Sequence, residues 1–270
     1  MTVSSPDRTD RAWEPTAPSR AWPATARSVP GPAMWVAALR EVLLVAALYV
    51  GYSGVRLLAD THVAAAIDRA GSLLHLERLV GLDVEGFLNQ ATAQATWLGV
   101  AMSYWYSSLH YVVTPAVLVW LFWRHRDAYP RVRNALILAS AIALLGYLLV
   151  PMAPPRLMAD GYVDVLAQTA SYGWWSDHAS APVGLDGLTN EFAAMPSLHV
   201  GWAIWVAWAI AARTGRWGRA LAIAYAVGTV VVVIGTGNHW VLDAVAGGLL
   251  MWFAIVVTGV LERRRSAART

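Results

Sequence analysis

The sequence predicts an all-α, polytopic integral membrane protein with six transmembrane helices and short amphipathic helices at the membrane interface. Of the 270 residues, 57% are hydrophobic, only 14% are charged, and 15 are Trp. This composition excludes an ordinary soluble globular domain. The apolar residues are also gathered into runs long enough to cross the hydrocarbon core of a bilayer. The chain is therefore expected to fold within a membrane.

The two ends of the chain differ from its apolar middle. Residues 1–33 are rich in Pro, Ala, Ser, Thr and Arg and show no apolar periodicity, which predicts a disordered tail. This tail is not apolar enough for a cleavable signal peptide, so the first span is expected both to target and to anchor the chain. Residues 34–262 hold all the expected spans, and residues 263–270 form a short basic tail.

Apolar runs bounded by polar residues, Pro or Gly are expected to be the six transmembrane helices. The last of them contains Gly247 and Gly248, whose small size allows a neighbouring helix to pack closely. The expected spans cover approximately residues 35–58, 97–123, 134–152, 196–212, 220–234 and 240–261.

Two longer connections join these spans. Residues 60–94 alternate apolar and charged residues, with Gly71 and Gly81 as breaks, which predicts short amphipathic helices on the membrane surface. They either shape a lipid entrance or form a solvated cap. Residues 153–194 are polar, and a loop of this length is usually functional. The charged residues of the first connection are Asp68, Arg69, Glu77, Arg78, Asp83 and Glu85.

The distribution of Arg predicts the orientation of the chain, which has no Lys. Most Arg residues lie in the two termini and in the connections 124–133 and 213–219, which the positive-inside rule places in the cytoplasm. Both termini are therefore expected to be cytoplasmic, with residues 153–194 at the outer face of the cell membrane. Because the Arg residues are spread over cytoplasmic edges, no nucleic-acid partner is expected. The lack of Cys excludes disulfides and thiol chemistry.

Two polar stretches lie where an apolar run meets water, and each contains a His. His239 and Asp243 are four residues apart, which puts both on one helix face and lets the carboxylate hold one imidazole nitrogen while the other stays free. Ser197 precedes His199 at an expected helix start, where it caps the first turn and where an anion can bind. A lone interfacial His is usually structural, but two with polar neighbours and an Asp favour a functional site.

Three further residues are candidates. Arg156 opens the polar connection, and its planar guanidinium matches phosphate oxygens, although snorkelling to lipid phosphate is the alternative. Tyr106 and His110 lie deep in the second expected span and are possible lipid or head-group contacts. A buried intramembrane His is a functional hypothesis by default, yet a hydrogen bond to a neighbouring helix would satisfy His110 equally well.

The Pro-Ser-Leu-His segment at residues 196–199, followed by His239-x-x-x-Asp243, resembles the second and third signature motifs of the type 2 phosphatidic acid phosphatase superfamily. That superfamily also contains the vanadium haloperoxidases. The resemblance covers roughly residues 75–260 of the chain. It implies an enzyme that cleaves a phosphoester of a lipid.

Within that superfamily, residues 193–199 and 236–239 look most like the inositol phosphorylceramide synthase branch. The first family signature usually has a Lys and an Arg-Pro, but here only Pro-Pro-Arg at residues 154–156 takes that place. Val233 stands where the phosphatase branch has an Arg. Phosphate binding therefore rests on fewer cations than in the standard phosphatases, which favours a transferase.

The resemblance implies a mechanism without metal or other cofactor. His239, oriented by Asp243, would attack phosphorus and form a phosphohistidine intermediate, while His199 would protonate the departing alcohol and later deprotonate the acceptor. The residues expected to hold the phosphate oxygens are Arg156, Ser197 and Asn238.

The acceptor decides the name of the reaction. Transfer to water gives a lipid phosphate phosphatase, and transfer to the hydroxyl of another lipid gives a phosphotransferase of the inositolphosphotransferase type. The expected partners are a lipid phosphate or phospholipid, a lipid-hydroxyl acceptor and the surrounding membrane lipids. A transporter or scaffold that kept the fold without the chemistry is the alternative, with Tyr106 and His110 lining a path.

Overall fold

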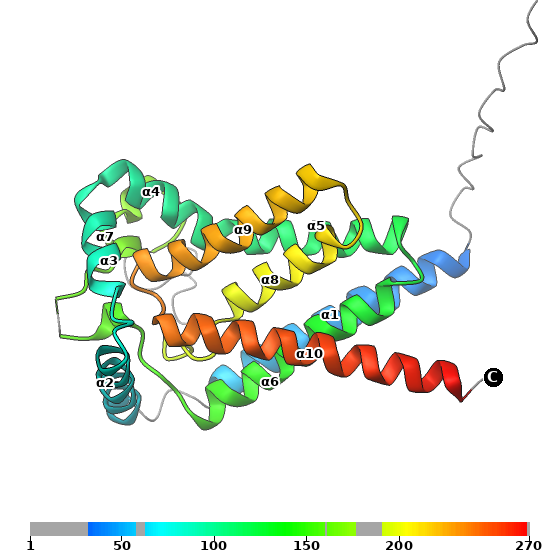
Figure 1. Ribbon diagram of the computed structural model, residues 1–270, viewed down its shortest axis with the longest axis horizontal. Helices are drawn as coiled ribbons and strands as arrows, with labels where there is room; N and C mark the ends of the chain where they lie inside the picture. Colours follow the sequence, from blue (N-terminus) through cyan, green and yellow to red (C-terminus); the bar gives the residue numbers. More distant parts are fainter. Residues whose placement is uncertain (1–31, 58–62, 160, 177–190, 269–270) are drawn as a thin grey trace, which may run out of the picture. The chain divides into compact units, whose positions relative to one another are not determined.

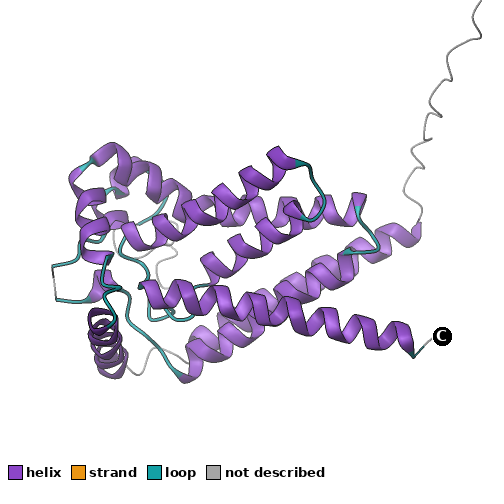
Figure 2. Ribbon diagram, viewed as in Figure 1, coloured by secondary structure: helices purple, strands orange, loops and turns teal. Residues whose placement is uncertain are grey.

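The computed structural model describes residues 32–57, 63–159, 161–176 and 191–268 (Figure 1). These residues form helices joined by turns and loops, and none of them belongs to a β-strand (Figure 2). The all-α prediction is therefore confirmed for the described part of the chain. Most of the expected N-terminal tail, residues 1–31, lies outside it.

The chain divides into two compact units, residues 1–46 and 47–270. The described residues of the first unit belong to α1 (Pro32–Leu57), which continues into the second unit. The second unit holds every other element and all the candidate site residues.

The second unit combines long helices with short helical turns that carry polar residues. The long connection between α6 and α8 contains most of the short turns. The bounds are α2 (Val63–Leu79), α3 (Glu85–Gln94), α4 (Thr96–Tyr104), the π-helical turn η1 (Trp105–Leu109), α5 (His110–Arg124), α6 (Tyr129–Leu149), the 3₁₀ turn η2 (Pro155–Leu157), α7 (Val165–Gln168), the 3₁₀ turn η3 (Ala170–Tyr172), α8 (Leu198–Ala211), α9 (Arg216–Gly235) and α10 (Val241–Ala267).

Among the described helices, 3 are long and apolar enough to cross a membrane, namely α6, α9 and α10. This fits the predicted membrane protein. Helix α8 is apolar but has only 14 residues, which at ~1.5 Å per residue is about 21 Å, shorter than a hydrocarbon core of about 30 Å. The expected second span is divided into α4, η1 and α5. The other three expected spans stay predictions.

The sequence predicts that Gly71 and Gly81 both interrupt the helices of residues 60–94, but only Gly81 does so. Helix α2 runs through Gly71, because one Gly in the interior of a helix costs only about 1 kcal/mol. An added methyl group at this position would meet nothing within 4 Å. Gly81 does separate α2 from α3. Its φ of 70° lies in the left-handed region, which Gly adopts without steric cost.

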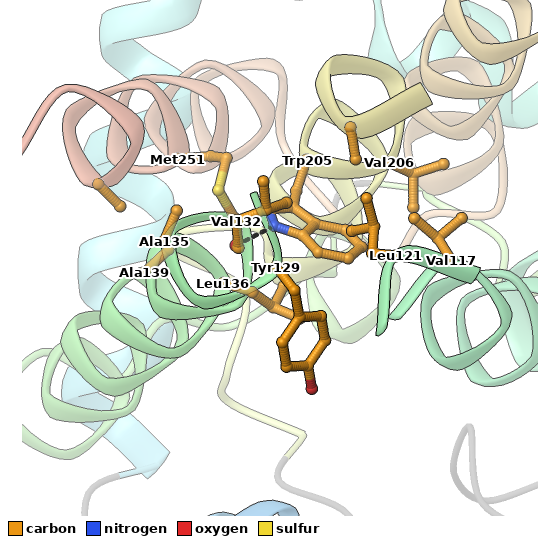
Figure 3. Close-up of a cluster of buried hydrophobic side chains, with 12 residues drawn as sticks. Val117, Leu121, Tyr129, Val132, Ala135, Leu136, Ala139, Trp205, Val206 and Met251 are labelled. Carbon is orange, nitrogen blue, oxygen red and sulfur yellow. Dashed lines mark hydrogen bonds between the residues drawn. The ribbon is translucent and has the colours of Figure 1, made fainter. Parts of the chain in front are cut away.

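Helix α8 lies between α9 and α10 and also packs against α5 and α6 (Figure 1). Its Trp205 is fully buried, and the indole Nε1–H donates to the Val132 carbonyl oxygen of α6 at 2.7 Å (Figure 3). This core holds α8 against its neighbours. The other buried side chains of the cluster are Val117, Leu121, Tyr129, Ala135, Leu136, Ala139, Val206, Ala209, Met251 and Ala254.

The two ends of the polar connection 153–194 meet. The Met152 N–H donates to the Phe192 carbonyl oxygen at 2.8 Å, and the Ala194 N–H donates to the Met152 carbonyl oxygen at 3.3 Å. Residues 177–190, within this connection, lie outside the described residues. The pairing brings the start of the connection next to the segment that leads into α8.

Candidate active site

His239 lies in the turn between α9 and α10 and is 4% exposed. Its Nδ1 is 2.9 Å from the Ala194 carbonyl oxygen and 3.5 Å from Asp243 Oδ2. A carbonyl oxygen only accepts hydrogen bonds, so Nδ1 carries the proton and Nε2 keeps the lone pair. The sequence predicted that Asp243 would hold the imidazole. The structure adds the shorter contact, to a backbone carbonyl that no motif indicates.

Asp243 is fully buried in the first turn of α10. Its Oδ2 accepts a hydrogen bond from the Trp240 N–H at 2.9 Å, which caps the helix, and the same oxygen faces His239. Its Oδ1 is buried without a hydrogen-bond partner among the described atoms. The carboxylate thus both begins α10 and places a negative charge beside the imidazole.

His199 follows the N-cap of α8. Ser197 is that cap, as predicted: its Oγ accepts a hydrogen bond from the Val200 N–H at 3.4 Å. The Ser197 N–H donates to the Asp243 carbonyl oxygen at 3.0 Å, which joins the starts of α8 and α10. The ring centroids of His199 and His239 are 5.8 Å apart at an angle of 61°. The structure therefore brings the two predicted histidines together.

Tyr106 and His110 contact His199. The Tyr106 ring is stacked on the His199 ring at 4.3 Å and 23°, and the His110 ring meets it edge-on at 4.4 Å. Both residues come from the π-helical turn η1 and the residue that follows it. Such π turns occur often at functional sites. His110 Nδ1 and His199 Nε2 are buried, and no described atom hydrogen-bonds to either.

Arg156, in η2, is also buried, its side chain being 5% exposed. Its Nη1 donates to Asp164 Oδ2 at 3.1 Å and lies 3.8 Å from Glu191 Oε1. Its Nε donates to Asn238 Oδ1 at 3.0 Å. The backbone N–H of Arg156 donates to the Gly237 carbonyl oxygen at 2.9 Å. The predicted phosphate clamp is thus attached to the residues just before His239, and it is flanked by carboxylates that the sequence did not reveal.

Asn238 is held by contacts within the protein. Its Oδ1 accepts from Arg156, and its Nδ2 donates to Thr236 Oγ1 at 3.0 Å. Both ends of the amide are therefore used within the protein. This arrangement orients Arg156. The direct contact with phosphate oxygens that the sequence predicts for Asn238 stays a prediction.

Glu77 and Glu85 were expected as charges of surface helices, but both are fully buried. Glu85 Oε1 accepts a hydrogen bond from the Val241 N–H at 2.8 Å, and Glu77 Oε1 accepts one from the Leu242 N–H at 2.7 Å. These N–H groups belong to the first turn of α10, whose donors have no partner inside the helix. Acidic side chains from α2 and α3 therefore cap the helix that carries Asp243.

One signal in the sequence could have located Glu77. It follows Leu73 by four residues and Leu74 by three, so it lies on the same stripe of α2. The buried residues of this stripe are Ala66, Ala70, Leu73, Leu74 and Glu77. An acidic residue on the apolar face of a helix requires a buried hydrogen-bond donor.

Asn89 of α3 is a further polar residue of the site, and no motif in the sequence indicates it. It is fully buried, and its Nδ2 donates to the Val163 carbonyl oxygen at 2.9 Å and to the Gly235 carbonyl oxygen at 3.2 Å. Its Oδ1 accepts from the Val163 N–H at 2.7 Å. It thereby joins α3, the end of α9 and the loop that carries Arg156. Within the described ranges, no group of 3 or more His, Asp and Glu residues could hold a metal ion.

A comparison with protein-family models matches residues 71–257 to the model described as PAP2 superfamily. The matched region contains both histidines, Asp243 and Arg156. Searches of curated proteins and of solved structures found no match.

Proposed function

Since the chain belongs to the PAP2 superfamily, we propose that it is a membrane-embedded lipid phosphotransferase or lipid phosphate phosphatase that works through a phosphohistidine intermediate. The observation that carries this proposal is the setting of His239. Its Nδ1–H faces the Ala194 carbonyl oxygen at 2.9 Å and Asp243 Oδ2 at 3.5 Å. This fixes the tautomer in which Nε2 has a free lone pair, the form that a nucleophilic imidazole needs.

In the first step, His239 Nε2 attacks phosphorus. A P–N bond forms while the P–O bond to the alcohol of the lipid substrate breaks. His199 gives a proton to the departing oxygen, so the alcohol leaves as a neutral molecule. The negative charge of Asp243 stabilises the positive charge that develops on the His239 ring.

In the second step, the acceptor hydroxyl gives its proton to His199, and its oxygen attacks phosphorus. The P–N bond breaks, and His239 regains its lone pair. Water as acceptor gives a phosphatase, whereas a lipid hydroxyl gives a transferase. The likeness to inositol phosphorylceramide synthases in the segments around His199 and His239 supports transfer of a phosphoinositol-type group to a lipid hydroxyl.

Arg156 supplies the positive charge for the phosphate oxygens. Asn238 and Asp164 hold its guanidinium at 3.0 and 3.1 Å, respectively, so it is oriented before the substrate binds. The start of α8 at Ser197 adds the positive end of a helix dipole. Tyr106 and His110, which touch His199, contact the lipid or its head group. The site lies at the outer face of the cell membrane, with both termini in the cytoplasm.

The test uses the detergent-purified protein with a panel of lipid phosphates and phosphatidylinositol, with and without a hydroxyl-lipid acceptor. Free phosphate and new phospholipid are both measured, together with acid-quenched phosphoprotein. The active-site variant is His239→Ala. The matched control is His75→Ala, because His75 is exposed on α2.

Phosphate release without acceptor, lost in His239→Ala and kept in His75→Ala, identifies a phosphatase. Acceptor-dependent phospholipid with little phosphate release identifies a transferase. Equal product formation by the wild type and His239→Ala would exclude His239 as the nucleophile, whereas no product from either protein would favour a transporter or scaffold.

A further inference from the structure

The start of α10 is held by acidic side chains from three different elements. The N–H groups of Trp240, Val241 and Leu242 donate to Asp243 Oδ2, Glu85 Oε1 and Glu77 Oε1 at 2.9, 2.8 and 2.7 Å. All three acidic residues are fully buried. Negative side chains are favoured at a helix N-terminus, where unpaired N–H groups and the positive end of the dipole are found.

The second oxygen of each Glu has no such donor. Glu77 Oε2 and Glu85 Oε2 are both buried without a hydrogen-bond partner among the described atoms. The Oε1 atoms of the two carboxyl groups accept from the consecutive N–H groups of Val241 and Leu242, so the two carboxyl groups lie beside each other at the start of α10. Two ionised carboxylates cannot donate a hydrogen bond, whereas a single proton shared between them satisfies both oxygens.

We propose that Glu77 and Glu85 form a carboxyl pair that shares one proton and positions the first turn of α10, and with it Asp243 and His239. They are positioning residues, since they reach the site only through the backbone of α10. The shared proton leaves one negative charge on the pair. This lowers the repulsion on the neighbouring Asp243, which can then stay ionised beside His239. The proposal rests on the proposed function of that site.

The charges around Glu77 agree with a shared proton. Burial, with the nearby Glu85 and Asp243 carboxylates, raises the pKa of Glu77 from its ordinary value of 4.5 to about 8, against the lowering effect of the Leu242 N–H. The charged groups that face it are thus Glu85 on α3 and Asp243 on α10. A raised carboxyl pKa means that the contribution to stability is fully present below about pH 4.5 and is lost as the pH rises through about 8.

The experiment compares Glu77→Gln with Glu77→Leu in the full-length protein. Gln keeps an oxygen for the Leu242 N–H, and its NH₂ group donates to Glu85 as the shared proton does. Leu keeps the approximate size but leaves the Leu242 N–H without an acceptor. The matched control is Asp83→Asn, because Asp83 is an exposed acid in the turn between α2 and α3, 4.0 Å from Arg78.

We expect Glu77→Gln to keep kcat within about threefold of wild type at pH 7, and Glu77→Leu to lose roughly tenfold or more with little change in KM, because small displacements of reacting groups are costly. The unfolding midpoint, followed by Trp fluorescence, should fall between about pH 4.5 and about pH 8 in the wild type and in Asp83→Asn. It should fall much less in Glu77→Gln, which cannot ionise.

The unfolding measurement needs no substrate, so it tests the pair even if the wild type shows no phosphotransfer. If only the proposed function is wrong, the unfolding midpoints of the wild type and Glu77→Gln still differ in their pH dependence. A Glu77→Leu protein with wild-type kcat would overturn the positioning role. The same pH dependence of the unfolding midpoint in wild type and Glu77→Gln would overturn the shared proton.

Discussion

A methyl group on Gly247 would collide with the Ser197 carbonyl oxygen, so α10 meets the start of α8 backbone to backbone. The Ser197 N–H also donates to the Asp243 carbonyl oxygen at 3.0 Å, one turn earlier in α10. These contacts join the helix that begins beside His199 to the helix that begins beside His239. The distance between the two histidines therefore depends on a position where only Gly fits.

Gly247→Ala is expected to push α10 away from α8 and to lower kcat by roughly tenfold or more, since misplacing reacting groups by about 1 Å can cost about a hundredfold. The control is Gly248→Ala, whose methyl group would meet only the movable end of the Ile204 side chain, at 3.0 Å. Phosphotransfer and the unfolding midpoint are measured for both. Wild-type activity in Gly247→Ala would contradict the close contact.

Asp243→Asn is expected to lower kcat by roughly 10- to 100-fold. The Asn side-chain oxygen can still accept from the Trp240 N–H, so the helix cap remains, but the negative charge beside His239 is lost. The loss should be smaller than the roughly 10⁴-fold effect known where an Asp is the essential partner of a catalytic His. The Ala194 carbonyl oxygen still holds the Nδ1 proton here. The rate of phosphoprotein formation after acid quenching checks this, and a 10⁴-fold loss would disprove the role of Ala194.

Arg156→Lys is expected to raise KM and lower kcat although the charge is kept. A single ammonium group cannot donate to Asn238 and Asp164 while also facing the phosphate, as the planar guanidinium does. We expect a loss in kcat/KM of roughly tenfold or more, the size of one charge-assisted hydrogen bond. Arg78→Lys, at an exposed position, serves as the control. Equal kcat/KM values for Arg156→Lys and Arg78→Lys would show that Arg156 does not bind the phosphate.

His110→Phe tests the second histidine that touches His199. Phe keeps an aromatic ring at this position but removes both nitrogens, one of which is buried without a described partner. We expect kcat/KM to fall by roughly tenfold, the effect of losing one hydrogen bond to the substrate. Tyr106→Phe keeps the ring that stacks on His199 at 4.3 Å and is expected to change kcat/KM by no more than about threefold. Identical kcat/KM values for the wild type and His110→Phe would show that His110 only packs against His199 and does not bind the substrate.

Trp205→Phe is expected to destabilise the fold by about 1–3 kcal/mol, because it removes the indole that fills the core and donates to Val132. The unfolding midpoint should fall while KM stays near the wild-type value. Trp252→Phe is the control, since Trp252 is 63% exposed and its change should cost less than about 0.5 kcal/mol. Similar midpoints for the two variants would show that the core tolerates the loss of Trp205.

Several features of the site could be predicted because they depend on neighbouring residues. Ser197 caps α8 through an N–H only three residues away, and His239 and Asp243 are brought together by their spacing at the start of α10. Three of the apolar runs likewise become the long helices α6, α9 and α10, since helix formation follows local periodicity. Their bounds moved by a few residues because the caps, not hydropathy, end a helix.

The sequence by itself therefore determined the helical class, the membrane character and the two histidine segments. Only the tertiary structure decided which distant atoms hydrogen-bond to the histidine segments and hold them in place. Glu77 and Glu85 reach N–H groups 165 and 156 residues further along the chain, and the carbonyl oxygen of Ala194 lies 45 residues before His239. Local patterns show that a residue is polar or apolar, but the partner of a buried polar group is set by how distant segments pack. That packing places the carboxyl groups of Glu77 and Glu85 at the start of α10, where they accept hydrogen bonds from backbone N–H groups instead of facing water.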